Sequence, residues 1–584
     1  MGKCACRCSL SARQAVENVP PLLLYRFGRA LHGTLGCKLI ILLISVCFGL
    51  KGMLDSLTME ALLPLSKELN FDGVAYQRIY SLAVTPYALV GFVGSVSDYF
   101  PIMGYHKKYY ILITNVIGGA CSICLVIMPK SMAGSNIIYV GMLYCGIHLH
   151  IATADLLCEG TYCKVIQAHP SVGAKLIGFV SMCKSLGHVM GRTVVGPISD
   201  YLGTRPLLYM GVPLVLQSLL PAACNFLGEV AGQDKGSNTF MKEKTDKGVF
   251  YVALLTSLFA CAALVLTLQT WVGYPIIFTA FVVVVLGSAF WFLLSRRLAL
   301  CTMFFFADRV LHLTISGAVN FYYIAPPDCV PDGPQFDYTY FCTYTAFVAA
   351  VGCWFGIYAF QKWCKGWSAR AIFWLLNCVR ILAALFDYVM TRRLNIAIGI
   401  PDKVMYMLGD AIVFHLLLTL SCMTSSLTIA RSCPPKLEST VYAIVSSVSN
   451  LGSTCSKMLG VVAIELADIR MKQDMPGGCD FKALPNLILV SQCVLPMISI
   501  PLAYFMLPTE PLNAAMPPGH RRSRRSIAPT QDTAPFEEPE DDAHEGATGG
   551  ALSETLAIHS TVENKVDVAV VAGDTGSRPR IVEV

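Results

Sequence analysis

The chain has 584 residues, of which 55% are hydrophobic and 14% are charged, and its formal net charge is +6. An ordinary soluble domain carries roughly 25% charged residues. Together with a mean hydropathy of +0.58, this composition excludes a soluble globular protein and predicts an all-α polytopic membrane protein. The excess of basic residues fits loops that lie on an anionic membrane surface, and it does not indicate nucleic-acid binding.

Apolar runs long enough to cross about 30 Å of hydrocarbon predict about fourteen transmembrane helices, arranged as six, two and six. We expect an N-terminal six-helix bundle over residues 37–227, two additional transmembrane helices over 249–293 and a C-terminal six-helix bundle over 299–506. The predicted spans are 37–55, 79–97, 109–128, 136–158, 172–196, 207–227, 249–269, 271–293, 299–325, 339–361, 370–390, 404–430, 437–464 and 484–506.

Three polar segments flank and interrupt these spans. Residues 1–36 are basic and contain no cleavable signal peptide, and residues 228–248 form a loop of alternating charge. Residues 510–584 are rich in Pro, Ala, Glu and Asp and predict a disordered tail. The distribution of Lys and Arg places all three segments in the cytoplasm, although the loops containing Arg393 and Arg470 disagree with this orientation.

Most of the cysteines are scattered singly through apolar segments, where they are expected to behave as small buried hydrophobes. Cys329 and Cys342 flank a polar loop, and a disulfide between them is an open possibility if that loop faces an oxidising compartment. Acylation of the cysteines near the N-terminus, in MGKCACRC, is equally open.

An internal repeat appears at the ends of the second and fifth predicted helices. GSVSDYF contains Gly94 and Asp98, and GPISDYL contains Gly196 and Asp200. The glycine permits close approach of a neighbouring helix, and the aspartate can bond to the end of that neighbour. The second copy, with Arg205, resembles the G-x-x-x-D-x-x-G-x-R loop of the major facilitator superfamily, so Asp98, Asp200 and Arg205 are predicted to have gating or structural roles.

Two longer blocks resemble the folate-biopterin transporter family. These are DLLCEGTYCKVIQAHP from Asp155, and RLNIAIGIPDKVMYMLGDAIV from Arg393 with ARSCPPKLESTVYAIVSSVSNLGS from Ala430. The resemblance covers roughly residues 40–506 and implies a major-facilitator-like fold whose two halves rock around a central cavity. It implies folates or pterins as substrates, although related members carry other metabolites such as S-adenosylmethionine. Thr161 and Cys163 depart from the family pattern.

Asp155 and Glu159 lie four residues apart, on one face of the fourth predicted helix. Carboxylates within a membrane are costly and are functional candidates. For Asp155 we expect substrate binding or proton coupling, with a structural hinge as the alternative. Glu159, followed by Gly160, is expected to hold a cytoplasmic gate.

The fifth helix carries a cationic stripe of Lys184, His188 and Arg192, spaced four residues apart. An anionic solute needs such a cation, which Arg contacts bidentately and Lys contacts as a point charge. The alternative is that Lys184 and Arg192 neutralise Asp155 and Glu159.

Further charged residues occur in the second half of the chain. Asp308, Arg380 and Asp410 are second-tier candidate cavity residues, because opposite charges within a bundle are more often ion pairs that hold one conformation than ligands. Asp402 and Glu438 match motif positions of the family and stand at helix ends, where we expect capping. Lys457 is a lone cation of the thirteenth helix whose side the sequence does not assign.

These features predict a secondary-active transporter of folate or pterin-like solutes, coupled to protons and embedded in the plasma membrane or an organelle membrane. The chain has no phosphate-binding loop, no zinc-type spacing and no sign of an enzyme or of a cofactor. A transporter of another metabolite such as S-adenosylmethionine is the alternative within this class. A sensor or scaffold acting through the tail at 510–584 is the alternative outside it.

Overall fold

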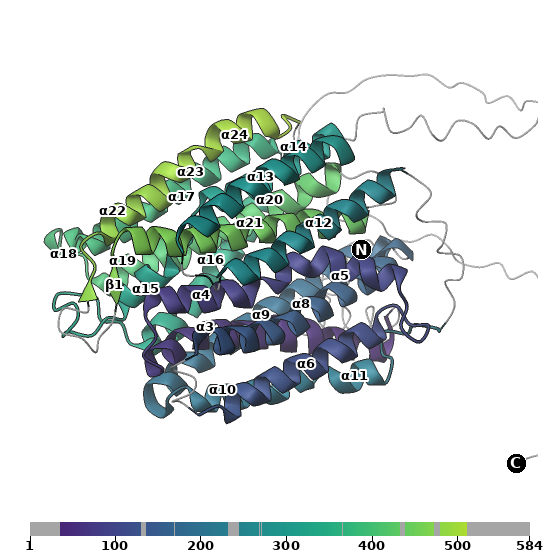
Figure 1. Cartoon of the computed structure of the whole chain (residues 1–584), viewed down its shortest axis with the longest axis horizontal. Coiled ribbons are helices and arrows are strands. Elements are labelled where there is room, and N and C mark those ends of the chain that lie inside the picture. The colour runs from purple at the N-terminus through teal and green to yellow at the C-terminus, as the bar shows by residue number, and fades with distance from the viewer. Residues whose placement is uncertain are drawn as a thin grey trace, which may run out of the picture. The chain divides into compact units, whose positions relative to one another are not determined.

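In the computed structural model (Figure 1), the described residues are 35–129, 136–168, 170–231, 244–267, 269, 271–364, 366–432, 438–471 and 479–510. All of them belong to one compact unit, residues 1–516. Three segments fall largely outside the described residues: the basic leader, the polar loop at 228–248 and the tail beyond residue 510. The predictions of acylation and of a disordered tail therefore concern residues that are not described.

The first six spans are built from long helices, several of which consist of two consecutive segments. The first span, Leu35–Glu68, and the second, Gly73–Asp98, are each continuous. The elements are η1 (Ile44–Leu54), α3 (Asp55–Glu68), α4 (Gly73–Val84), α5 (Pro86–Tyr99), α6 (Lys108–Ile127), α8 (Ile137–Ala168), α9 (Pro170–Leu202), α10 (Arg205–Leu216) and α11 (Leu219–Ala223).

The next two spans are α12 (Lys244–Thr267) and α13 (Gly273–Leu293), and the last six follow them. The last six contain several π-helical segments, and a short antiparallel hairpin precedes the final span. The elements are α14 (Arg296–Leu311), α15 (Ser316–Tyr323), η3 (Thr339–Tyr344), α16 (Thr345–Ala359), η4 (Phe360–Cys364), α17 (Ala369–Thr391), α18 (Leu394–Ala397), α19 (Asp402–Tyr406), η5 (Met407–Phe414), α20 (His415–Ser432), α21 (Glu438–Leu466), β1 (Arg470–Met471), β2 (Cys479–Asp480), α22 (Leu484–Ile488), η6 (Leu489–Val494), α23 (Leu495–Met497) and α24 (Ser499–Met506).

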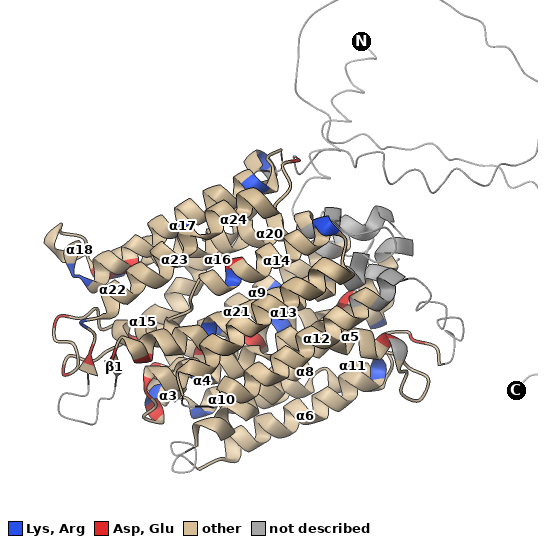
Figure 2. Cartoon of the chain, turned by 45° about the horizontal axis from the view of Figure 1, so that its top comes forward, with Lys and Arg blue, Asp and Glu red and all other residues tan. Residues whose placement is uncertain are grey.

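By length and apolar composition, the described residues contain eleven to twelve membrane spans, fewer than the fourteen that the sequence predicts. Within the described residues, eleven helices are long and apolar enough to cross a membrane, and α14 with α15 forms a twelfth span with a bend of 41°. The remaining two long helices, α9 and α21, have 33 and 29 residues and carry more polar side chains. Figure 2 shows that charged residues lie mainly at the helix ends, with a few inside the bundle. The chain is therefore an integral, multi-pass, all-α membrane protein.

The bend between α14 and α15 leaves backbone groups without helical partners, and side chains of two other helices satisfy them. Ser456 of α21 accepts from the Thr314 backbone N–H at 3.1 Å and donates to the His312 carbonyl at 2.6 Å. Gln77 of α4 donates to the Thr314 carbonyl at 2.5 Å. A broken helix at membrane depth is tolerated where such partners exist. The bend consequently ties helices of the first and last six spans together.

Several helices of the two halves are in direct contact. α21 packs along α4 and α5, η3 packs against α9, and α12 contacts both α5 and α21. Gly91 permits one close approach of α5 to α21, where its N–H donates to Ser447 Oγ at 2.7 Å. Of the two additional helices, α12 lies beside α5 and α21 and α13 packs against α12, α14 and α21; neither contributes a described residue to the cavity below.

The disulfide between Cys329 and Cys342 that the sequence left open is not formed. Cys329 is bonded to Cys479 of β2, with the two Cα atoms 5.4 Å apart, whereas Cys342 is a free and buried cysteine of η3. The bridge joins the loop after α15 to the hairpin after α21. We call the end of the bundle at which α9, α15 and α21 terminate the disulfide face.

Candidate substrate cavity

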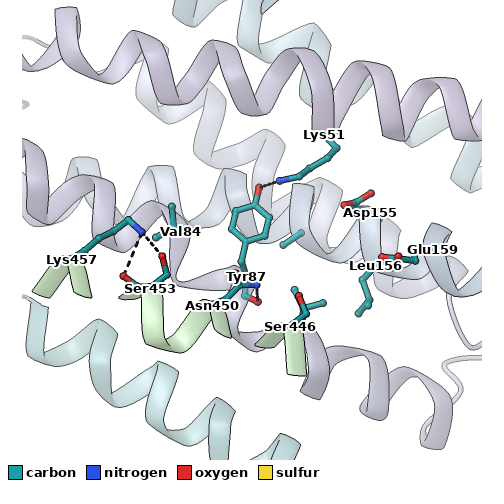
Figure 3. A pocket seen from close by; sticks show the side chains of 12 residues that line it. Lys51, Val84, Tyr87, Asp155, Leu156, Glu159, Ser446, Asn450, Ser453 and Lys457 are labelled. Carbon is teal, nitrogen blue, oxygen red and sulfur yellow. Dashed lines mark hydrogen bonds between the residues drawn. The ribbon is translucent and has the colours of Figure 1, made fainter. Parts of the chain in front are cut away.

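A cavity of about 360 Å³ lies inside the bundle, between α21 and the helices η1, α4, α5 and α8 (Figure 3). This volume is within the range of small-molecule sites, about 300–1,000 Å³. Because α21 belongs to the last six spans and the other helices to the first six, the two halves of the chain supply opposite walls. The lining residues are Lys51, Val84, Tyr87, Val90, Ala152, Asp155, Leu156, Glu159, Ser446, Asn450, Ser453 and Lys457.

One wall of the cavity is the polar face of α21. Ser446, Asn450, Ser453 and Lys457 follow one another at intervals of three or four residues, which places them on one side of the helix. Asn450 Nδ2 donates to the Tyr87 carbonyl of α5 at 3.0 Å, so this face is tied to the opposite wall at one point. The sequence analysis left the side of Lys457 unassigned and did not identify Ser446, Asn450 and Ser453 as cavity residues. Their spacing of three or four residues is the pattern that could have identified them.

A buried cluster around Asp55 supports the opposite wall. Tyr87 Oη donates to Asp55 Oδ1 at 2.7 Å, and Lys51 Nζ lies 3.0 Å from Asp55 Oδ2 and 3.1 Å from Tyr87 Oη. His148 Nδ1, on α8, is 3.3 Å from Asp55 Oδ1. The sequence analysis missed this cluster because it ended the first helix at residue 55. The pairing of Lys51 and Asp55, four residues apart at the end of an apolar run, was the available signal.

Asp155 and Glu159 both line the cavity, on α8. Asp155 Oδ1 is 2.6 Å from Lys184 Nζ of α9, so this member of the predicted cationic stripe faces a carboxylate. Glu159 stands one turn further along α8, and within the described residues it has no Lys or Arg nitrogen within 4 Å. Gly160 is half-buried, and a Cβ added to it would lie 3.1 Å from Lys107 Nζ.

The other end of the cationic stripe faces a different acid. Arg192 Nε is 2.9 Å from Glu60 Oε1 of α3, and its Nη1 is 3.4 Å from His415 Nε2 of α20. His188 lies half-buried between Lys184 and Arg192 on α9. The first span continues to Glu68, so Glu60 is a membrane residue that the sequence analysis placed outside the helix.

Asp308 and Arg380 come together in a buried network of the second half, away from the cavity lining. Arg380 Nη1 is 3.8 Å from Asp308 Oδ2 and 2.8 Å from His312 Nε2. His312 Nδ1 also bonds to the Asp308 carbonyl at 2.7 Å. This geometry matches an ion pair that joins α14 to α17. The side chain of Asp410 lies outside the described part of the chain.

The second copy of the internal repeat has the geometry that the sequence predicts for it. A Cβ on Gly196 would lie 2.6 Å from Thr339 Cα, so α9 and η3 are in close contact. Asp200 accepts hydrogen bonds from the backbone N–H groups of Tyr338 and Thr339, at 3.1 and 2.7 Å, and from Thr339 Oγ1 at 2.5 Å. The aspartate therefore holds the start of η3, at the disulfide face.

The remaining residues with predicted gating roles are dispersed. Asp98 is exposed in the last turn of α5, and Arg205 is exposed at the first position of α10. Asp402 does not act as a simple cap: its two oxygens accept from Arg393 at 2.7 and 2.9 Å, and Asn395 donates to it at 2.7 Å. These bonds fix the turn between α18 and α19. The side chain of Glu438 is not among those described.

Comparisons with known proteins agree with this architecture. The Arabidopsis thaliana protein named probable folate-biopterin transporter 6 is 22% identical over 387 residues, which cover 66% of this chain and 67% of that protein. The Synechocystis folate-biopterin transporter is 20% identical over 407 residues, which cover 68% and 69% of the two chains. The crystal structure of the POT family transporter PepTSo superimposes with a TM-score of 0.56 and 12% identity, covering 80% of this chain and 98% of that one.

The helical architecture has a fold of the major facilitator type, and the relatives named as transporters place the chain among multi-pass membrane transporters and not among enzymes. A protein of this class takes a small molecule across the bilayer. The chain belongs to the BT1 family, whose sequence profile matches residues 49–518.

Proposed function

We propose that this protein is a secondary-active transporter of folate- or pterin-class solutes that works by alternating access. The observation that carries the proposal is the cavity whose walls come from the two halves of the chain, α21 on one side and η1, α5 and α8 on the other. A site between two halves that move against each other can open to either side of the membrane. The names of the relatives supply the solute class.

The chemistry of the cavity suits a pterin. The ring system presents N–H donors along one edge, and a carboxylate accepts such donors in pairs. Asp155 and Glu159 provide carboxylates at one end of the cavity. The side chain of Tyr87, in the wall between Lys51 and Asn450, offers an aromatic face of the kind on which a heterocycle packs.

Alternating access requires contacts between the halves that break when the protein opens. Four such contacts lie toward the disulfide face: Asp200 with Thr339, Gln77 with Thr314, Arg78 with Glu465, and Tyr76 with Asn320. In the proposed cycle these contacts close the outer side. The bundles 37–227 and 299–506 move as the two halves, with both termini in the cytoplasm and the plasma membrane as the site of action.

Proton coupling is the proposed source of energy. Asp155 has Lys184 as its partner, and a proton bound by Asp155 would release the ammonium of Lys184. Exchange between a proton and an ion-pair partner is a common way to link protonation to a conformational change. In this proposal, protonation of Asp155 and arrival of the solute favour the same rearrangement of α8 against α9.

Uptake of radiolabelled folate and biopterin into proteoliposomes, under an imposed pH gradient, tests the proposal. We expect uptake of at least one solute, stimulation by the gradient, and loss of that stimulation in Asp155→Asn. If neither compound is transported by correctly inserted protein, the solute class is wrong. If uptake is insensitive to the gradient, proton coupling is wrong.

Two alternatives give different outcomes in the same assay. Stronger competition by S-adenosylmethionine than by either pterin would assign the cavity to an amino-acid-bearing metabolite. A sensor or scaffold would lose its function on deletion of residues 511–584 and keep it in Asp155→Asn. The transporter proposal expects the truncated protein to retain uptake.

A further inference from the structure

Lys457 differs from most of the cations that face the interior of the bundle. Each of Lys51, Lys184, Arg192 and Arg380 has a carboxylate oxygen within 4 Å. Lys457 is only 6% exposed, lines the cavity, and has no carboxylate within that distance anywhere in the described residues. Among the described residues, its ammonium is therefore a buried group without a carboxylate counter-ion.

The surroundings of Lys457 stabilise a cation only in part. Nζ donates to Ser453 Oγ at 3.0 Å and lies 3.5 Å from the Ser453 carbonyl, and it stands 5.3 Å from the centroid of the Tyr80 ring. An ammonium has three donors, so the contacts with Ser453 leave at least one donor unused. A buried charge without full compensation costs several kcal/mol and is retained where it has a function.

The charged neighbour on the adjacent helix adds to the positive potential. Arg309 of α14 packs against α21 at Gly452, where a Cβ would lie 3.1 Å from Arg309 Cβ. Arg309 interacts electrostatically with Lys457 and, within the described part of the chain, also has no carboxylate oxygen within 4 Å. Because Arg309 also interacts with Asp308, Lys457 is the cation of the two that has no acid nearby among the described residues, and its positive charge attracts an anion.

The cavity is bipolar along its length. Figure 3 shows Lys457 and Ser453 at one end, Asp155 and Glu159 at the other, and Tyr87 with Asn450 between them. A solute with an anionic group at one end and N–H donors at the other matches this arrangement. The reverse orientation would bring its anion beside Glu159 and beside Asp155, whose charge Lys184 already compensates, so an anion is less favourable at this end than at Lys457.

We infer that Lys457 is the anion subsite of the cavity and receives a carboxylate of the transported solute. The inference rests on the proposed transport function and adds a substrate class to it: carboxylate-bearing pterins such as folate, in preference to pterins without a carboxylate such as biopterin. Ser453 orients the ammonium, and Arg309 supports the potential. Lys184 and Arg192, which are paired with Asp155 and Glu60, remain with those acids when the solute binds.

The test compares Lys457→Gln and Lys457→Arg in the full-length protein. Binding is measured as ligand-induced thermal stabilisation, with folate, with biopterin and with p-aminobenzoylglutamate, which has the carboxylates without the pterin. We expect Lys457→Gln to lower the affinity for folate and for p-aminobenzoylglutamate by about 10- to 100-fold, which is the usual effect of losing a charge-assisted hydrogen bond. The affinity for biopterin should change by less than about threefold. Lys457→Arg should retain most of the affinity for folate.

Two outcomes would overturn the inference. One is an equal loss for folate and biopterin in Lys457→Gln, which would indicate a general structural role. The other is a wild-type protein that neither carboxylate compound stabilises. If no pterin binds but p-aminobenzoylglutamate stabilises the wild type and not Lys457→Gln, the proposed solute class fails and the anion subsite stands.

Discussion

α9 and α21 are two long helices of similar construction, but they differ in whether their interior cations are paired with carboxylates. Both are more polar than the neighbouring spans, and both end at the disulfide face with an acid that bonds to the other half of the chain. Asp200 of α9 holds η3, and Glu465 of α21 pairs with Arg78 of α4 at 2.7 Å. Inside the bundle, however, the cations of α9 face acids, whereas Lys457 of α21 has none within reach.

This difference separates charges that hold the structure from a charge that is available to a ligand. Lys184 and Arg192 connect α9 to α8 and α3, within the first half, and their removal would leave the half-buried acids Asp155 and Glu60 uncompensated. Lys457 pairs with no acid in the part of the chain that the structure describes, so its removal leaves no carboxylate of that part uncompensated. A cation alone in a sequence therefore does not reveal its role, because the role depends on which acids the fold brings within reach.

The largest effect is expected from breaking an interior pair of α9. Lys184→Met leaves Asp155 without its partner and should destabilise the protein by about 3 kcal/mol, as is typical when one member of a buried pair is removed. The apparent Tm of the detergent-solubilised protein measures the loss. The double variant Lys184→Met/Asp155→Leu should recover most of it. An unchanged Tm in Lys184→Met would show that the pair does not stabilise the fold.

A smaller effect is expected at the end of α9. Asp200→Ala removes the acceptor of three hydrogen bonds at the start of η3, and by analogy with helix caps should cost about 1 kcal/mol. Asp200→Asn, which keeps an acceptor, should cost less. The exposed pair of Asp468 and Arg470 offers the control, since Asp468→Ala should stay within about 0.5 kcal/mol of the wild type. Equal shifts in the two alanine variants would contradict the assigned role of Asp200.

The corresponding contact at the end of α21 should be weaker still. Arg78 and Glu465 are partly exposed, with side-chain exposures of 19% and 26%, and a double-mutant cycle should give a coupling of about 0.5–1 kcal/mol. The cycle uses Arg78→Ala, Glu465→Ala and the double variant, read as apparent Tm. Additive effects of the two substitutions would show that this pair does not hold α4 against α21.

The sequence was sufficient for the spans and for one close contact, because both depend on local patterns. Apolar length predicts the membrane helices, and the repeat at Gly196 and Asp200 predicts the approach of η3 to α9. The sequence could not predict the disulfide partner of Cys329, because that partner, Cys479, lies 150 residues further along the chain. The cavity depended on a similar long-range fact, the packing of α21 against α5, which no spacing within either helix contains.

The boundary of the first helix explains the other missed residues. Apolar length ended that helix at residue 55, whereas the structure continues it to Glu68 across Asp55 and Glu60. These acids are tolerated inside the bundle because Lys51, His148 and Arg192 meet them. Two of these three partners come from other helices, so a span that contains charge is recognised only once its partners are known.

The smallest effect on stability is expected at Lys457, and it is the sharpest test of the contrast between α9 and α21. Lys457→Met replaces an uncompensated ammonium with an apolar chain of similar length, so the unliganded protein should be as stable as the wild type or more stable. The matched variant is Lys184→Met, with the same chemical change in a cation that has a carboxylate at 2.6 Å. The apparent Tm of Lys184→Met should fall below that of the wild type. The apparent Tm of Lys457→Met should rise or stay unchanged. A fall of similar size in both would mean that Lys457 supports the fold in the same way as Lys184, and the distinction between the two helices would not hold.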